Sequence, residues 1–237
     1  MNILITGGSR GIGFEMAQRF AEIGDNNIVA ISRNEAGLKD LKNACIRKNV
    51  QAHLYPIAFD LENVSTYESE LLPKIQQYVQ HIDILINNAG MLINKPFESI
   101  SMDEALKMCS VNFIAPAQLT KTLLPLLRKG TTPHIVNISS MGGFQGSQKF
   151  KGLSIYSATK GALAVLTECL AEELKDSKIS VNCLALGSVN TPMLNEAFPG
   201  YNSPINSNEM AKWIADFAMS GGRLFNGKVI PVAITTP

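Results

Sequence analysis

The chain has 237 residues, of which 46% are hydrophobic and 17% are charged, and its formal net charge is +1. This apolar content supports a substantial core and excludes an intrinsically disordered chain. The balanced charge lacks the basic footprint that binds nucleic acid or an anionic membrane, and it favours a small-molecule partner. No targeting segment opens the sequence and no apolar run is long enough to span a bilayer, so we expect a cytoplasmic protein.

Short β-rich runs alternate with longer segments of helical apolar spacing along the whole chain. Strands are predicted at Asn2–Thr6, Ile28–Ser32, Gln51–Ala58, Ile82–Asn87, His134–Ser139, Ser180–Leu186 and Lys228–Ala233. Helices are predicted at Phe14–Glu22, Glu35–Lys48, Val64–Gln80, Met102–Lys129, Tyr156–Asp176 and Asn208–Met219. Near-continuous apolar runs such as NILIT and NIVAIS are typical of parallel strands buried on both faces. The pattern predicts an α/β fold, a Rossmann-type doubly wound sheet of about seven parallel strands flanked by helices.

No change in composition or low-complexity linker divides the sequence, so we expect a single domain over residues 1–237. A stretch rich in Asn, Pro and Gly at about 187–207 is interpreted as a loop that covers a substrate. The cysteines and histidines are scattered without metal-ligand spacing, which predicts reduced thiols used for packing and no metal. They are Cys45, Cys109, Cys169, Cys183, His53, His81 and His134.

A glycine-rich segment, TGGSRGIG, follows the first predicted strand and opens into a helix that begins around Gly11. Glycines let the backbone approach a pyrophosphate, and a helix N-terminus offers free amide donors to it. The spacing through Gly7, Gly11 and Gly13 is G-x-x-x-G-x-G, which differs from the commoner G-x-G-x-x-G fingerprint. The segment therefore predicts a dinucleotide site, with a ligand-free glycine turn as the alternative.

The end of the second strand bears on the choice of nucleotide. It ends at Ser32, where an NAD enzyme usually carries an acidic residue for the adenosine ribose, and Arg33 follows directly. Arg33 and Arg10 of the glycine segment can clamp a 2′-phosphate through charge-assisted donors. NADP(H) is favoured on this basis. NAD(H) stays possible, because either arginine can simply face solvent.

Five motifs in this order resemble the short-chain dehydrogenase/reductase family: TGGSRGIG, NNAG at 87–90, Asn112, Ser140 and YSATK at 156–160. The resemblance runs from the first strand to NGKVIPV near the C-terminus. It implies that Asp60 and Leu61 bind adenine, that the NNAG segment steadies the sheet and borders the cofactor, and that Val189 and Thr191 hold the nicotinamide carboxamide. With the glycine turn and the residues at the end of the second strand, the predicted cofactor-binding set is Gly7, Ser9, Arg10, Gly11, Ile12, Gly13, Ser32, Arg33, Asp60, Leu61, Asn88, Ala89, Gly90, Tyr156, Lys160, Val189 and Thr191.

Tyr156 and Lys160 lie four residues apart in a predicted helix, so their side chains share one face. A nearby ammonium is expected to lower the tyrosine pKa and so make the phenol a usable proton donor and acceptor. The resemblance implies that Lys160 also binds the nicotinamide ribose, that Ser140 holds the substrate oxygen, and that Asn112 kinks its helix and connects Lys160 to solvent through a water. An ordinary amphipathic helix face is the alternative for the Tyr-Lys spacing.

Two departures from the family pattern limit what the resemblance implies. Leu186-Gly187 stands where Pro-Gly is common, which weakens the assignment of the nicotinamide contacts. The segment between Ser140 and Tyr156 is longer than usual and carries Lys149 and Lys151. We expect a bulge near the substrate entrance. Its lysines either attract an acidic or carrier-bound substrate or belong to a solvated loop or a subunit contact.

The predicted activity is NADP(H)-dependent hydride transfer between nicotinamide and a carbonyl or secondary alcohol. A 3-oxoacyl-thioester (acyl-carrier-protein) reductase and a polyol or secondary-alcohol dehydrogenase are neighbouring alternatives. A non-catalytic nucleotide-sensing regulator is an alternative of another class, since a fold alone does not establish function. The resemblance further implies a homodimer or homotetramer formed through the helices at 102–129 and 156–176.

Overall fold

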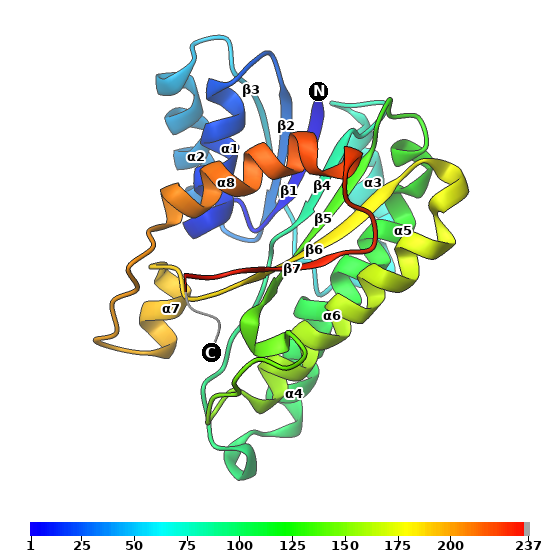
Figure 1. Ribbon diagram of the computed structural model, residues 1–237. Helices are drawn as coiled ribbons and strands as arrows, with labels where there is room; N and C mark the ends of the chain where they lie inside the picture. Colours follow the sequence, from blue (N-terminus) through cyan, green and yellow to red (C-terminus); the bar gives the residue numbers. More distant parts are fainter. Residues whose placement is uncertain (235–237) are drawn as a thin grey trace.

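The computed structural model describes residues 1–234, and it contains one seven-stranded parallel sheet. The strand order is β3-β2-β1-β4-β5-β6-β7, which is the predicted doubly wound arrangement (Figure 1). The strands are β1 (Asn2–Thr6), β2 (Asn27–Ser32), β3 (His53–Ala58), β4 (Ile84–Asn87), β5 (His134–Ser140), β6 (Ser180–Leu186) and β7 (Val229–Val232). The predicted domain ran to residue 237, and its last three residues lie outside the described part.

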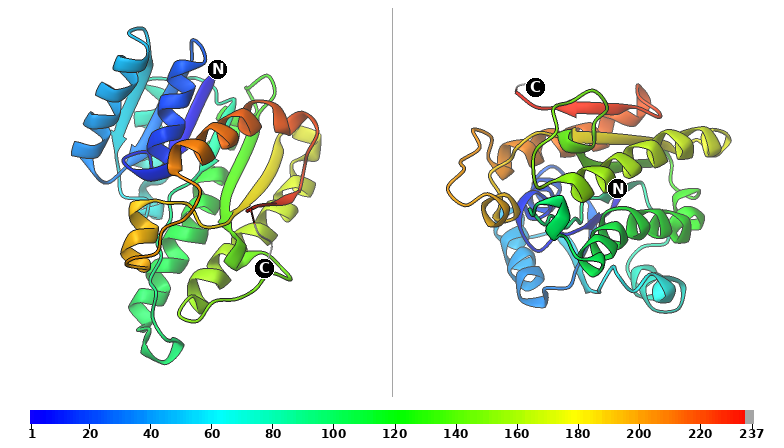
Figure 2. Two further views of the ribbon diagram at one scale, coloured as in Figure 1. Left: turned by 60° about the vertical axis from the view of Figure 1, so that its left-hand side comes forward. Right: turned by 90° about the horizontal axis from the view of Figure 1, so that it is seen from below.

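Helices cover both faces of the sheet, as the apolar strands require (Figure 2). One layer consists of α1 (Gly11–Glu22), α2 (Glu35–Lys48) and α8 (Ser207–Ser220). The other consists of α3 (Leu72–Gln76), α4 (Met102–Cys109), α5 (Ala115–Leu127) and α6 (Ser154–Glu173). Alternate residues of each strand enter opposite cores. Ile3 and Ile5 pack in the α1 layer, whereas Leu4 packs in the α5 layer.

Two predicted helices are interrupted, and in each a π turn ends two residues before a proline. The predicted helix at 64–80 consists of a 3₁₀ turn at Val64–Thr66, a π-helical turn at Tyr67–Leu71 and then α3. The predicted helix at 102–129 is split by a second π turn at Ser110–Ile114. Pro73 and Pro116 stand in the first turn of the helix that follows, and they have no N–H for the carbonyl four residues earlier. The wider π turn is one way to accommodate this missing donor.

Smaller differences concern the ends of elements and the thiols. Strand β3 begins two residues later than predicted, and a six-residue helix, α7 (Pro192–Ala197), lies within the predicted loop at 187–207. All four cysteines are free, but Cys169 is exposed, so the prediction that every one is a packing residue was wrong for it. Within residues 1–234 no helix combines the length and the apolar character needed to cross a bilayer.

Candidate active site

The glycine turn after β1 has the backbone geometry that close approach of a ligand requires. Gly7 and Gly11 adopt φ values of 72° and 60°, in the left-handed region that L side chains disfavour. A Cβ on Gly13 would lie 2.3 Å from the carbonyl oxygen of Gly7, so only glycine fits there. Helix α1 begins at Gly11, and its N-cap residue Arg10 provides no side-chain cap. The first amides of α1 thus remain available to an anion, and the turn fits a dinucleotide pyrophosphate.

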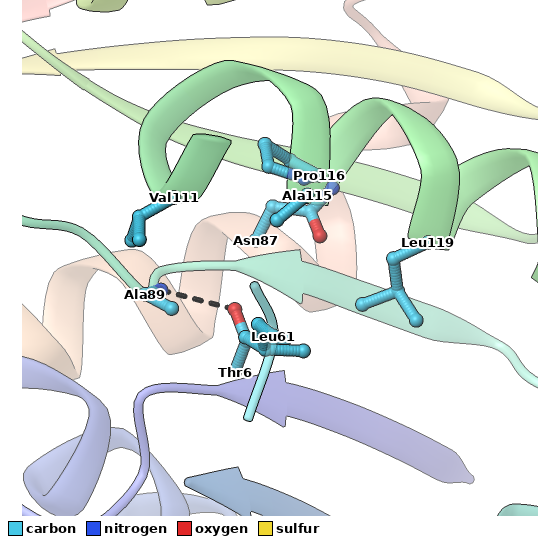
Figure 3. A pocket seen from close by; sticks show the side chains of 8 residues that line it. All are labelled: Thr6, Leu61, Asn87, Ala89, Val111, Ala115, Pro116 and Leu119. Carbon is cyan, nitrogen blue, oxygen red and sulfur yellow. Dashed lines mark hydrogen bonds between the residues drawn. The ribbon is translucent and has the colours of Figure 1, made fainter. Parts of the chain in front are cut away.

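The NNAG segment ties the ends of β1 and β4 together behind this turn. Thr6 Oγ1 accepts hydrogen bonds from the backbone N–H groups of Asn88 and Ala89, both at 3.0 Å, and Figure 3 shows the bond from Ala89. Asn88 Nδ2 returns a bond of 2.9 Å to the Thr6 carbonyl. Asn87 Nδ2 donates to Asn137 Oδ1 at 2.8 Å, which links β4 to β5. These bonds fix the sheet edge from which Gly90 continues.

Figure 3 shows the small enclosed space behind this edge, between Thr6, Leu61, Asn87 and the start of α5. Its volume is about 10 Å³, too small for any ligand larger than a water molecule. Asn87 Oδ1 is buried there without a hydrogen-bond partner among residues 1–234. The space adjoins the ligand cleft, with which it shares Leu61, Ala89 and Val111, and it is too small to be the ligand site itself.

Asn112 lies in the π turn between α4 and α5 and is completely buried. Its Oδ1 accepts from the Met91 N–H at 2.7 Å, and its Nδ2 donates to the Met91 carbonyl at 2.8 Å and to Thr159 Oγ1 at 3.0 Å. The side chain therefore joins the loop after β4 to helix α6. A π turn lies where the kink was expected, and both polar atoms of the Asn112 amide bind neighbouring residues. The water link from Lys160 to solvent stays a prediction.

Ser140, Tyr156 and Lys160 come together at the carboxyl end of β5. Ser140 ends that strand, and Tyr156 and Lys160 lie on α6, where both side chains are buried. Lys160 Nζ donates to the Ile138 carbonyl at 2.8 Å. The NNAG segment also approaches this lysine, since a Cβ on Gly90 would lie 3.4 Å from Lys160 Nζ. Both Ser139 and Ser140 line the cleft, but Ser139 is buried and donates to the Lys160 carbonyl at 2.8 Å, whereas Ser140 is partly exposed.

Burial shifts the titration of this pair. It lowers the pKa of Lys160 from 10.5 to about 8, since removing an ammonium from water disfavours its charged form. It also raises the pKa of Tyr156, with the Ser140 hydrogen bond acting in the opposite direction. The expected lowering of the tyrosine pKa by Lys160 is therefore absent from the structure. The reason is that desolvation of the phenol outweighs the other influences on it.

A single cleft of about 1090 Å³ runs from the glycine turn to Tyr156. Of the predicted site residues only Gly13 and Asn112 do not line it, because Gly13 packs behind the turn and Asn112 lies beneath the floor. Phe198 and Tyr201 border the cleft, whereas Lys149 and Lys151 do not. Lys149 instead donates to the Phe144 carbonyl and to Ser147 Oγ, which favours the interpretation of a solvated loop.

Carboxylates lie at the end of the cleft that Arg10 and Arg33 line, and the residues that follow β2 in the sequence gave no sign of them. No acidic residue directly follows β2, yet Arg33 Nη1 lies 3.2 Å from Glu62 and 3.7 Å from Asp60, which come from the loop after β3. Ser9 and Ser32 share a hydrogen bond of 2.7 Å. Arg10 is paired with Glu196 of α7 at 2.5 Å. Both arginines therefore line the cleft and are paired with carboxylates.

Sequence reasoning missed Glu196 and Asn34 among the residues that line the cleft. Asn34 Oδ1 accepts from the Gly37 N–H at 3.1 Å and caps α2, and an asparagine directly before a predicted helix is a readable capping signal. Glu196 gave no such signal, because its partner Arg10 is far away in the sequence.

A family model described as short chain dehydrogenase matches residues 1–202. The ketoacyl reductase HetN of Nostoc sp. is 35% identical over 79% of this chain, and the match covers 63% of HetN. The chain thus spans less than two thirds of that relative's length. Two solved structures agree along nearly the whole chain. A 3-ketoacyl-(acyl-carrier-protein) reductase from Brucella melitensis, complexed with NADH, has 25% identity and a TM-score of 0.85 over 98% of this chain and 96% of that one. RhlG of Pseudomonas aeruginosa, an NADP active-site complex, has 26% identity and a TM-score of 0.84 over 98% and 94%.

The chain therefore belongs to the short-chain dehydrogenase family. This is a family of oxidoreductases that act on C=O or CH–OH groups with nicotinamide cofactors.

Proposed function

We propose that this protein is an NADP(H)-dependent oxidoreductase that interconverts a carbonyl compound and its secondary alcohol. One observation carries the proposal: the Ser140, Tyr156 and Lys160 group opens onto the same cleft as the glycine turn. A dinucleotide bound along that cleft reaches from the turn to the buried pair. Val189 and Thr191 line the cleft and are proposed to hold the carboxamide.

Three side chains act on the substrate or its proton in this proposal. The nicotinamide, when bound, supplies or accepts the hydride. Ser140 donates a hydrogen bond to the substrate oxygen and so fixes it where negative charge develops. Tyr156 gives its phenolic proton to that oxygen during reduction and takes it back during oxidation. Lys160 contributes positive charge beside the phenol and holds the nicotinamide ribose.

Asn112 is a positioning residue in this scheme. Its amide holds both backbone polar groups of Met91 and the hydroxyl of Thr159, which itself donates to the Tyr156 carbonyl at 2.8 Å. The helix turn that carries the tyrosine is thereby held against the loop that borders the cofactor.

The preference for NADP(H) over NAD(H) is supported by Arg10 and Arg33, which line the adenosine end of the cleft. Arg33→Ala is expected to raise the KM for NADPH much more than the KM for NADH, because only the former has a 2′-phosphate. Equal effects on the two cofactors would refute the preference.

A 3-oxoacyl-thioester is the second candidate substrate. It is favoured by the names of two similar proteins, a ketoacyl reductase and a 3-ketoacyl-(acyl-carrier-protein) reductase, and by the apolar lining of the cleft. That lining includes Met141, Phe150, Leu153, Met193 and Phe198. A regulator without chemistry is disfavoured because the chain retains all four predicted catalytic-site residues, Asn112, Ser140, Tyr156 and Lys160.

Turnover is the direct test. NADPH and NADH are each supplied with ketones, aldehydes, sugars and 3-oxoacyl thioesters, and Tyr156→Phe serves as the background. We expect the wild type to turn over at least one class, while the variant binds nucleotide but does not react. Full activity in Tyr156→Phe would remove the tyrosine from the mechanism.

We further propose that the protein self-associates through α4, α5 and α6. Exposed large apolar side chains on or between these helices support this, namely Met102, Leu106, Ile114 and Val165. Light scattering of the wild type and of Leu106→Glu tests it. A dimer or tetramer that the variant weakens is expected, and a monomeric wild type would contradict the proposal.

A further inference from the structure

Helix α7 is attached to the rest of the molecule at its start and near its end. At the start, Thr191 Oγ1 caps the helix by accepting from the Leu194 N–H at 3.2 Å. Near the end, Asn94 Nδ2 donates to the Ala197 carbonyl at 2.9 Å, and Arg10 forms a two-pronged pair with Glu196, at 2.5 and 3.4 Å. The helix thereby bridges the nucleotide end of the cleft and the loop after β4 (Figure 1).

The guanidinium group of Arg10 has two candidate partners, the Glu196 carboxylate and the 2′-phosphate of the proposed nucleotide. It is the N-cap residue of α1 and lines the cleft, where it is proposed to bind the 2′-phosphate. In the structure its Nη1 and Nη2 donors are directed to the carboxylate oxygens of Glu196. A phosphate that takes the same donors must replace this carboxylate or share the arginine with it.

We propose that Glu196 is a specificity-determining residue that competes with the 2′-phosphate of NADP(H) for Arg10. This inference rests on the proposed NADP(H) site. Binding of the 2′-phosphate releases α7 from the glycine turn, whereas NAD(H), which carries a hydroxyl at that position, leaves the Arg10–Glu196 pair in place. The same carboxylate therefore lowers the affinity for NADP(H) and couples the nucleotide to the segment that covers the substrate.

The exposure of the pair makes this exchange feasible. The side chains of Arg10 and Glu196 are 52% and 62% exposed, so water screens their attraction. Exposed ion pairs of this kind change an equilibrium by no more than about fivefold. A phosphate monoester carries up to two negative charges and offers three acceptor oxygens, so it is the stronger partner for the guanidinium.

Adenosine 2′,5′-bisphosphate and 5′-AMP separate the 2′-phosphate from the nicotinamide, which would itself touch the start of the covering segment. Their affinities are measured by calorimetry for the wild type, Glu196→Gln and the control Glu70→Gln, which removes an exposed carboxylate outside the cleft. Hydrogen exchange of residues 192–197 is followed in each state. The turnover of the wild type with NADPH is recorded separately.

We expect Glu196→Gln to bind the bisphosphate about twofold to fivefold more tightly than the wild type, with 5′-AMP affinity unchanged. In the wild type the bisphosphate accelerates exchange in α7 and 5′-AMP does not. In Glu196→Gln the helix exchanges rapidly even without ligand, and Glu70→Gln behaves as the wild type.

Equal bisphosphate affinity in the wild type and Glu196→Gln, or equal exchange of α7 in their free forms, overturns the proposal. If the wild type still turns over NADPH, the proposed function survives that failure. If the wild type binds the bisphosphate no better than 5′-AMP, the NADP(H) preference falls and the proposal falls with it.

Discussion

Lys160 is a cationic side chain buried beside the cleft, and its burial predicts how stability depends on pH. Its pKa is lowered from 10.5 to about 8 in the folded chain, whereas the unfolded chain keeps the ordinary value. Between these values the unfolded state binds more protons than the folded state, so the free energy of unfolding rises with pH. Below about pH 8 the amine is charged in both states and the desolvation cost is present in full.

The size of the effect follows from the two pKa values. For Lys160 alone, the free energy of unfolding rises by about 2 kcal/mol between roughly pH 7 and pH 9.5. The buried thiols of Cys45 and Cys183, whose pKa values are raised to about 12 and about 11, oppose this rise at higher pH. A variant that keeps both thiols and lacks the amine isolates the contribution of Lys160.

Urea unfolding of the nucleotide-free wild type and Lys160→Met, followed by circular dichroism across this pH range, measures that contribution. As the pH rises, we expect the free energy of unfolding of the wild type to increase by about 2 kcal/mol relative to that of the variant. Lys160→Arg, which stays charged, is the control and gains nothing. Stability curves for the wild type and Lys160→Met that run parallel with pH would refute the reasoning.

Three further predictions concern the support of the site. Gly13→Ala is expected to abolish nucleotide binding and to lower the melting temperature, because its Cβ would lie 2.3 Å from the Gly7 carbonyl oxygen. The control Gly161→Ala, whose Cβ has 3.4 Å available, is expected to be tolerated. Titration and scanning calorimetry measure the binding and the melting temperature, and normal nucleotide binding by Gly13→Ala would contradict the role given to the glycine turn. Asn112→Ala should lower the free energy of unfolding, measured in urea, by about 2–4 kcal/mol, because it leaves the N–H and the carbonyl of Met91 without their partner. A smaller loss of stability than that of Thr159→Val would argue against this role of Asn112. Ser140→Ala should reduce kcat with little loss of stability. Ser139→Ala should lower the free energy of unfolding by about 1 kcal/mol, because it breaks the hydrogen bond to the Lys160 carbonyl. The reverse pattern would mean that the roles of the two serines are exchanged.

Much of the fold was predictable because it depends on patterns local in the sequence. Runs such as NILIT are apolar at every position, since alternate residues enter the two cores, and that pattern predicted parallel strands. The glycines of the first turn were predictable for a similar reason, because backbone geometry restricts the residue type. Helix capping by Asn34 belongs to the same class, although it was overlooked.

The π turns and the pairs at the cleft were not predictable in this way. Apolar spacing continues through 102–129, so periodicity gives no sign that the helix widens before Pro116. The partners of Arg10 and Arg33 come from α7 and from the loop after β3, and only tertiary structure brings them together. The direction of the Tyr156 pKa shift was wrongly predicted. The spacing of Tyr156 and Lys160 indicates that a charged side chain is near, but it does not indicate how deeply the phenol is buried.

The sheet order also has a consequence for a chain that is still being synthesised. Strand β1 forms its second set of ladder bonds with β4, where Ile3 pairs with Ile84, so one edge of β1 has no partner until that later segment has left the ribosome. Strands β5, β6 and β7 then join the open edge in the order in which they are made. The nascent protein thus exposes a growing strand edge throughout translation, a stage at which edge-to-edge aggregation is a hazard.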